Sequence, residues 1–93
     1  MTFEEYIGTI IRRKRKALGW SQEDLAELVD ISKVTLSDIE QGRHRTTVRT
    51  IAALFVNLDL DLRIISDLIK EKYLYDERYL IKREQLLKKY PIR

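Results

Sequence analysis

The 93-residue chain contains no cysteine and only one histidine, His44. The lack of cysteine excludes disulfides, cysteine-based zinc sites and thiol nucleophiles, and it is typical of cytosolic proteins. A single histidine argues equally against a histidine metal site. Acid pairs such as Asp59 and Asp61 have no histidine, cysteine or Gly-rich phosphate loop with which to form a catalytic site. We therefore expect no enzyme, no cofactor and no metal. No apolar run approaches a membrane span and the N-terminus lacks the order of a signal peptide, which predicts a cytoplasmic protein without a membrane partner.

The net charge of +3 is unevenly distributed along the chain. Residues 1–20 and 66–93 each carry +3, residues 21–47 carry −3, and residues 48–65 are neutral. A chain of this length forms one small domain that buries roughly 60% of its unfolded surface, so association with another chain would help it.

The stretch WSQEDLAELVDISKVTLSDIEQG, residues 20–42, predicts two short helices joined by Asp30 and Ile31. Ser21 and Ser32 stand where N-caps are expected, and Asp24 completes a capping box with Ser21. The apolar positions are Leu25, Ala26, Leu28 and Val29 on the first helix and Leu36 and Ile39 on the second. That spacing leaves the second helix with an outer face of Lys33, Val34, Ser37, Asp38 and Gln41.

Two further helices are expected around this pair. The first runs from Phe3 to Leu18 and ends at Gly19. Its outer face carries Arg12, Arg13, Arg15 and Lys16, which either touch phosphates or form a solvated basic surface. Another helix begins after Thr47, which is placed to cap it, and its apolar positions are Val48, Ile51, Ala52, Leu54, Phe55 and Leu58.

From Leu58 the spacing of apolar residues changes to strict alternation, with Leu60, Leu62 and Ile64 on the same side. This pattern predicts a half-buried strand. Because no second strand is found in the chain, we expect two copies to pair across a two-fold axis as a homodimer. The alternative is a tight helical continuation. The chain then divides into residues 1–65, ending in the dimerisation strand, and a helical extension, residues 66–93.

The extension SDLIKEKYLYDERYLIKREQLLKKYPIR favours helix, with Asp76 placed to cap its second part and Pro91 ending it. Its tyrosines alternate with lysine and arginine. These tyrosines are Tyr73, Tyr75, Tyr79 and Tyr90. The pattern indicates one of three structures: a nucleic-acid surface, a partner-binding helix or an arm packed on the dimer.

The stretch from about Ile7 to Leu58 resembles the Cro/cI-like (XRE) helix-turn-helix family through LGWSQ, LA and IEQG at their spacings. The resemblance implies an all-α, lambda-repressor-like bundle of about five helices with the second motif helix in the DNA major groove. By position, the base-reading residues are Lys33, Val34, Ser37 and Asp38, and the backbone-contacting residues are Gln22, Gln41, Arg43 and Arg45. Arg15 and Glu40 match a pair that forms a structural salt bridge in the family.

A narrower resemblance covers TTVRTIAALFVNLDLDLRI, which is similar to the end of the HipB-type antitoxins. Those proteins repress their own operon and bind a kinase-fold toxin, so this resemblance implies a HipA-like partner. We therefore expect a repressor, prokaryotic or phage-encoded, that binds a two-fold DNA operator, with the antitoxin function as a refinement. The alternatives are a protein-interaction adaptor that binds DNA weakly and a stand-alone phage-type repressor.

Overall fold

The computed structural model describes residues 2–43, 45–71 and 76–92, which form six α-helices. His44, Tyr73 and Tyr75 lie outside the described residues. The chain divides into two compact units, residues 1–62 and residues 63–93, and each is described by itself. The predicted boundary between residues 65 and 66 stays a prediction. Within the described part of the chain, every helix is too short or too polar to cross a membrane.

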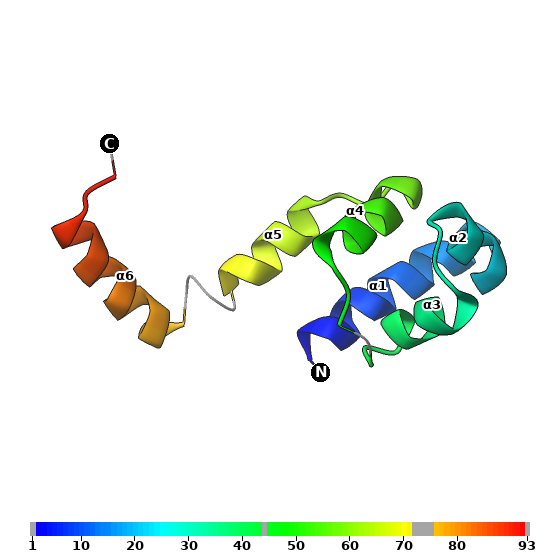
Figure 1. The fold of residues 1–93 in the computed structure, drawn as a ribbon, viewed down its shortest axis with the longest axis horizontal. Coiled ribbons are helices and arrows are strands. Elements are labelled where there is room, and N and C mark those ends of the chain that lie inside the picture. The colour runs from blue at the N-terminus through cyan, green and yellow to red at the C-terminus, as the bar shows by residue number, and fades with distance from the viewer. Residues whose placement is uncertain (1, 44, 72–75, 93) are drawn as a thin grey trace. The chain divides into compact units, whose positions relative to one another are not determined.

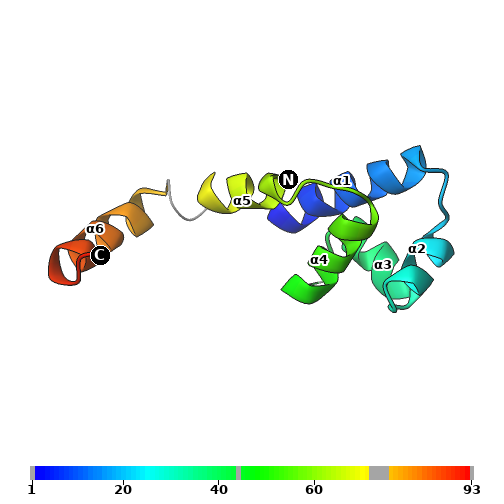
Figure 2. The same ribbon diagram turned by 90° about the horizontal axis from the view of Figure 1, so that it is seen from above.

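The first unit contains α1 (Phe3–Ala17), α2 (Gln22–Leu28), α3 (Lys33–Glu40) and α4 (Val48–Asn57). Helix α3 packs against both α1 and α2 (Figure 1). In the view from above, α2, α3 and α4 lie on the same side of α1 (Figure 2). This all-helical arrangement agrees with the expected fold class.

The core of this unit is formed by apolar side chains from all four helices, and most of them were expected to face inward. They are Ile7, Ile11, Leu25, Ala26, Leu36, Ile39, Leu54, Phe55 and Leu58. Two predicted core residues are instead exposed, Leu28 at 53% and Val48 at 86%. Both stand at a helix end, as the last residue of α2 and the first of α4.

Side-chain caps begin these helices where the sequence predicts them. Ser21 accepts from the backbone N–H of Asp24, Ser32 from that of Thr35, and Thr47 from that of Thr50. Each cap satisfies one backbone donor that the first helical turn leaves without a partner.

The four helices of the first unit also end in one common way. The residue after each C-cap takes a positive φ, and its N–H donates to the carbonyl oxygen three residues earlier. The next backbone N–H donates to the carbonyl oxygen five residues before it. These two hydrogen bonds define a Schellman motif, which requires a left-handed residue and therefore favours glycine, asparagine or aspartate. The left-handed residues are Gly19, Asp30, Gly42 and Asp59.

The predicted strand from Leu58 to Ile64 is wrong. Leu58 is the buried C-cap of α4, and the N–H of Leu60 donates to the Phe55 carbonyl oxygen at 2.8 Å, which takes that amide away from any strand pairing. Leu62 is half exposed, and Ile64 lies inside helix α5 (Arg63–Ile69). The alternative of a tight helical continuation is closer to the observed chain. The homodimer stays a prediction, but it has lost the strand as its interface.

The second unit contains α5 and α6 (Glu77–Lys89). Asp76 caps α6 as predicted, since its carboxylate accepts from the Arg78 backbone N–H at 2.9 Å. Neither helix contains a buried residue.

Candidate nucleic-acid interface

Helices α2 and α3 and the turn between them form a helix-turn-helix. The turn is short because Asp30 adopts a left-handed conformation with φ of 59° and the Ile31 N–H closes on the Ala26 carbonyl oxygen at 3.0 Å. Aspartate tolerates this region better than most residues, which explains how the turn forms without a glycine.

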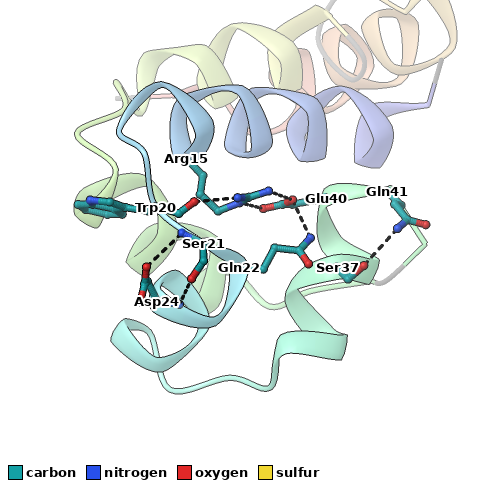
Figure 3. Close-up of polar contacts among 8 residues, drawn as sticks. All are labelled: Arg15, Trp20, Ser21, Gln22, Asp24, Ser37, Glu40 and Gln41. Atoms are coloured by element: carbon teal, nitrogen blue, oxygen red, sulfur yellow. Dashed lines mark hydrogen bonds and ion pairs between the residues drawn. The ribbon is translucent and has the colours of Figure 1, made fainter.

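The start of α2 is held by a complete capping box (Figure 3). The Asp24 N–H donates to Ser21 Oγ at 3.0 Å, and the Ser21 N–H donates to Asp24 Oδ2 at 3.1 Å. The backbone N–H of Ser21, and then its side chain, hold the pKa of the Asp24 carboxyl below its ordinary value of 3.8. Asp24 is therefore ionised and engaged with the helix end at neutral pH.

The first two base-reading candidates lie at the beginning of α3 and are exposed. Val34 is 71% exposed and has no polar group to satisfy, so it is available for an apolar contact such as a thymine methyl group. The Lys33 side chain is also exposed, but its ammonium is not free: Nζ lies 3.2 Å from Oε1 of Glu23 on α2. The sequence alone does not indicate this ion pair.

The other two candidates lie one turn further along α3 and are half-buried. Ser37 Oγ accepts from Gln41 Nε2 at 3.1 Å, so one polar group of each residue is already used (Figure 3). The Asp38 carbonyl oxygen accepts from the Arg43 N–H at 2.8 Å, which fixes the first residues after α3. The roles of these side chains toward DNA stay predictions.

The candidate backbone contacts are divided between the two ends of the motif. Arg43 and Arg45 are exposed in the connection after α3. Gln22, at the start of α2, is half-buried, and its Nε2 donates to Glu40 Oε1 at 3.1 Å. An amide nitrogen carries two protons, so Gln22 retains one donor for a phosphate oxygen while the other ties it to α3.

Beneath the motif, Arg15 of α1 and Glu40 at the end of α3 form a buried bidentate ion pair, so the expectation that Arg15 lies on the outer face of its helix is wrong. Arg15 Nε lies 2.7 Å from Glu40 Oε2 and Nη2 lies 3.0 Å from Oε1, with side-chain exposures of 8% and 1%. Nη1 also donates to the Trp20 carbonyl oxygen at 2.9 Å (Figure 3). The hydrogen bonds to Glu40 raise the pKa of Arg15 above its ordinary value, so the guanidinium stays charged. One side chain thus connects α1, the entry to α2 and the end of α3.

The comparisons with known proteins point to the same motif. A family model described as helix-turn-helix matches residues 11–65. The ImmF control region 10 kDa protein of Bacillus phage phi105 is 32% identical over 59 residues, which cover 63% of this chain and 66% of that protein. The chain therefore spans just under two thirds of the length of this relative.

Two solved structures are also similar. The restriction-modification controller protein C.AhdI from Aeromonas hydrophila aligns at 30% identity with a TM-score of 0.59, over 63% of this chain and 89% of that one. The clp gene regulator ClgR from Corynebacterium glutamicum shares the fold at 20% identity, with a TM-score of 0.66 over 99% of this chain and 98% of that one. With more than half of its length matched, the chain belongs to the helix-turn-helix family, of the Cro/cI-like (XRE) type that its motif residues resemble.

Proposed function

We propose that the chain is a sequence-specific DNA-binding transcriptional regulator that represses from a two-fold operator, including one at its own gene. The observation that carries this proposal is the exposed beginning of α3, where Lys33 and Val34 face solvent on a helix held from behind by the Arg15–Glu40 pair. A short helix fixed in this way fits the major groove, and its first residues meet base edges.

The net charge of −3 over residues 21–47 would oppose this function if every acid faced the DNA. Three of the six acids in that range are engaged within the protein. Asp24 caps α2, Glu40 is buried against Arg15, and Glu23 pairs with Lys33. Glu23 and Lys33 are both included in the count and cancel within it. The repulsion toward phosphates is smaller than the count implies because Arg15, from outside the range, neutralises Glu40, and because the helix dipole offsets part of the charge of Asp24.

A two-fold operator requires two copies of the motif, so the proposal includes a homodimer whose α3 helices lie about one DNA turn, roughly 34 Å, apart. Sedimentation of the chain alone and with a two-fold duplex measures this directly. One protomer per duplex at saturation would rule out the two-fold operator.

The antitoxin function depends on the resemblance to the HipB-type antitoxins near the end of the first unit. The segment that carries this resemblance, residues 46–64, includes the predicted strand from Leu58 to Ile64, which instead contains a helix end and the start of α5. The HipA-like toxin has thereby lost its main support, and a regulator without a toxin partner is the proposal that we favour. We place it in the cytoplasm, where its DNA is found.

The proposal is tested by fluorescence anisotropy with the DNA upstream of the chain's own gene and a shuffled duplex of the same composition. Lys33→Ala should cost about 1–3 kcal/mol on the native DNA and relax the preference at one base pair. Arg43→Ala should weaken binding to both duplexes alike and make the salt dependence shallower by about one ion.

Lys82→Ala is the matched control, since it removes an exposed lysine from α6 instead of α3. We expect it to leave the preference for the native DNA unchanged. Equal losses on both duplexes for Lys33→Ala would contradict the base-reading role, and equal weak binding of the unaltered protein to both would favour the adaptor alternative.

A further inference from the structure

The ion pair between Glu23 and Lys33 joins the two helices of the motif at its solvent-exposed surface. Glu23 is the second residue of α2 and Lys33 the first of α3, and their charged atoms lie 3.2 Å apart. The side chains are 73% and 57% exposed, so the pair contributes little to folding. Its position at the beginning of α3 suggests a role in binding.

A lysine by itself is a poor base reader. Its ammonium is a compact point charge on a flexible stem with three donors, and it binds the nearest phosphate as readily as a base edge. A phosphate contact positions the protein but carries no sequence information. A base-reading lysine therefore gains specificity from any neighbour that restricts where its ammonium points.

Glu23 is placed to supply that restriction. Its carboxylate occupies one of the three ammonium donors and leaves two, and guanine presents two acceptors, O6 and N7, in the major groove. The same carboxylate repels phosphates that approach the ammonium from its side. Both effects favour a guanine edge over the DNA backbone.

We propose that Glu23 is a positioning residue that determines specificity by orienting Lys33 toward guanine and withholding it from phosphates. This inference rests on the proposed function, because it requires Lys33 to meet a base. It assigns a binding role to an acid whose place in the first turn of α2 is otherwise explained by the helix dipole.

The test compares Glu23→Gln with the unaltered protein on two duplexes, one selected by that protein from a random-sequence pool and one shuffled. Glutamine keeps the shape of the side chain and removes its charge. Binding to the shuffled duplex should strengthen about two- to fivefold, the range that an exposed ion pair allows, while binding to the selected duplex should strengthen less. The ratio of the two affinities should therefore fall.

Glu27→Gln is the matched control, because it makes the same charge change one turn later on α2, and no hydrogen bond or ion pair of the Glu27 side chain is found among the described residues. It should raise both affinities by the same factor. Thermal denaturation of the variants checks that neither change alters folding.

A double-mutant cycle with Lys33→Met isolates the coupling between the two residues. In the Lys33→Met background, Glu23→Gln should no longer change the affinity ratio. If it changes the ratio as much as before, or if Glu23→Gln and Glu27→Gln behave alike, the positioning role is overturned while the proposed function stands. If the unaltered protein binds the selected and shuffled duplexes equally, both proposals fail.

Discussion

The two units of the chain both contain an ion pair between an arginine and a carboxylate, but the two pairs differ in burial. In residues 1–62 an arginine and a carboxylate form the buried Arg15–Glu40 pair, whereas in residues 63–93 the Arg78–Asp76 pair has side-chain exposures of 81% and 30%. Among the described residues, every buried side chain belongs to the first unit. This comparison shows that the first unit is stabilised by its own core. Helix α6 depends instead on local interactions, such as its Asp76 cap and the lysines in its last turn.

The largest difference in stability between the two units is expected from a substitution in the core. Phe55 of α4 is fully buried, and Phe55→Ala should destabilise the first unit by about 3–5 kcal/mol through lost burial and a residual cavity. Leu86 of α6 is 59% exposed, and Leu86→Ala should change stability by less than about 0.5 kcal/mol. Chemical denaturation followed by circular dichroism measures both. A comparable loss for the two variants would mean that α6 is packed against another surface in solution.

A smaller effect is expected where α1 meets the end of α3. A Cβ added at Gly8 would lie 2.6 Å from the Glu40 carbonyl oxygen and closer still to that of Ile39. In an exposed helix, glycine to alanine would stabilise by about 1 kcal/mol. At this contact the sign should reverse, and Gly8→Ala should destabilise by about 1–3 kcal/mol because the two helices must separate.

Thermal denaturation measures the effect of Gly8→Ala, and Gly19→Ala provides the contrast in the same experiment. Its added Cβ would meet no atom within 4 Å, so its cost arises only from the positive φ of 75°. A stabilising Gly8→Ala would show that α1 and α3 are further apart than described.

The smallest effect concerns pH and the caps of α2 and α6. The pKa of Asp24 is lowered by the Ser21 N–H, and the pKa of Asp76 is lowered by the Arg78 side chain. A carboxylate whose pKa is lower in the folded than in the unfolded chain contributes stability above its unfolded pKa and loses it as pH falls through the folded value. Both caps should therefore weaken as the pH falls below the ordinary aspartate pKa of 3.8.

Carbon-detected NMR titration of the two carboxyl groups checks this expectation. Asp24→Asn should remove the acid-dependent change at the start of α2 and leave that of α6 intact. The expectation is contradicted if Asp24 titrates at or above its ordinary pKa.

Local signals in the sequence predicted much of the first unit, because caps and apolar spacing act within a few residues. Ser21, Ser32 and Thr47 cap where expected. The strand prediction failed because the sequence at a helix end that contains a left-handed aspartate can show the same short alternation of apolar and polar residues as a strand. Asp59 followed by Leu60 ends α4 just as Asp30 followed by Ile31 ends α2, with the same pair of hydrogen bonds.

Contacts between distant residues were less accessible from the sequence. The Arg15–Glu40 pair came only from the family resemblance, since no periodicity relates residues 25 positions apart. The bonds from Gln22 to Glu40 and from Lys33 to Glu23 were missed altogether. Side-chain geometry across helices depends on the completed packing, which the local pattern does not specify.

The triple attachment of Arg15 also affects the thermodynamics of recognition. An isolated helix of the length of α3 would be largely unfolded in water, so a freely fraying α3 would lose conformational entropy on entering a groove. Because Arg15 fixes its last residue and Ser32 caps its first turn, that ordering is completed during folding, before DNA is met. Substitutions in α1 that loosen α3 would then lower affinity through a more unfavourable binding entropy, without removing a single contact to the operator.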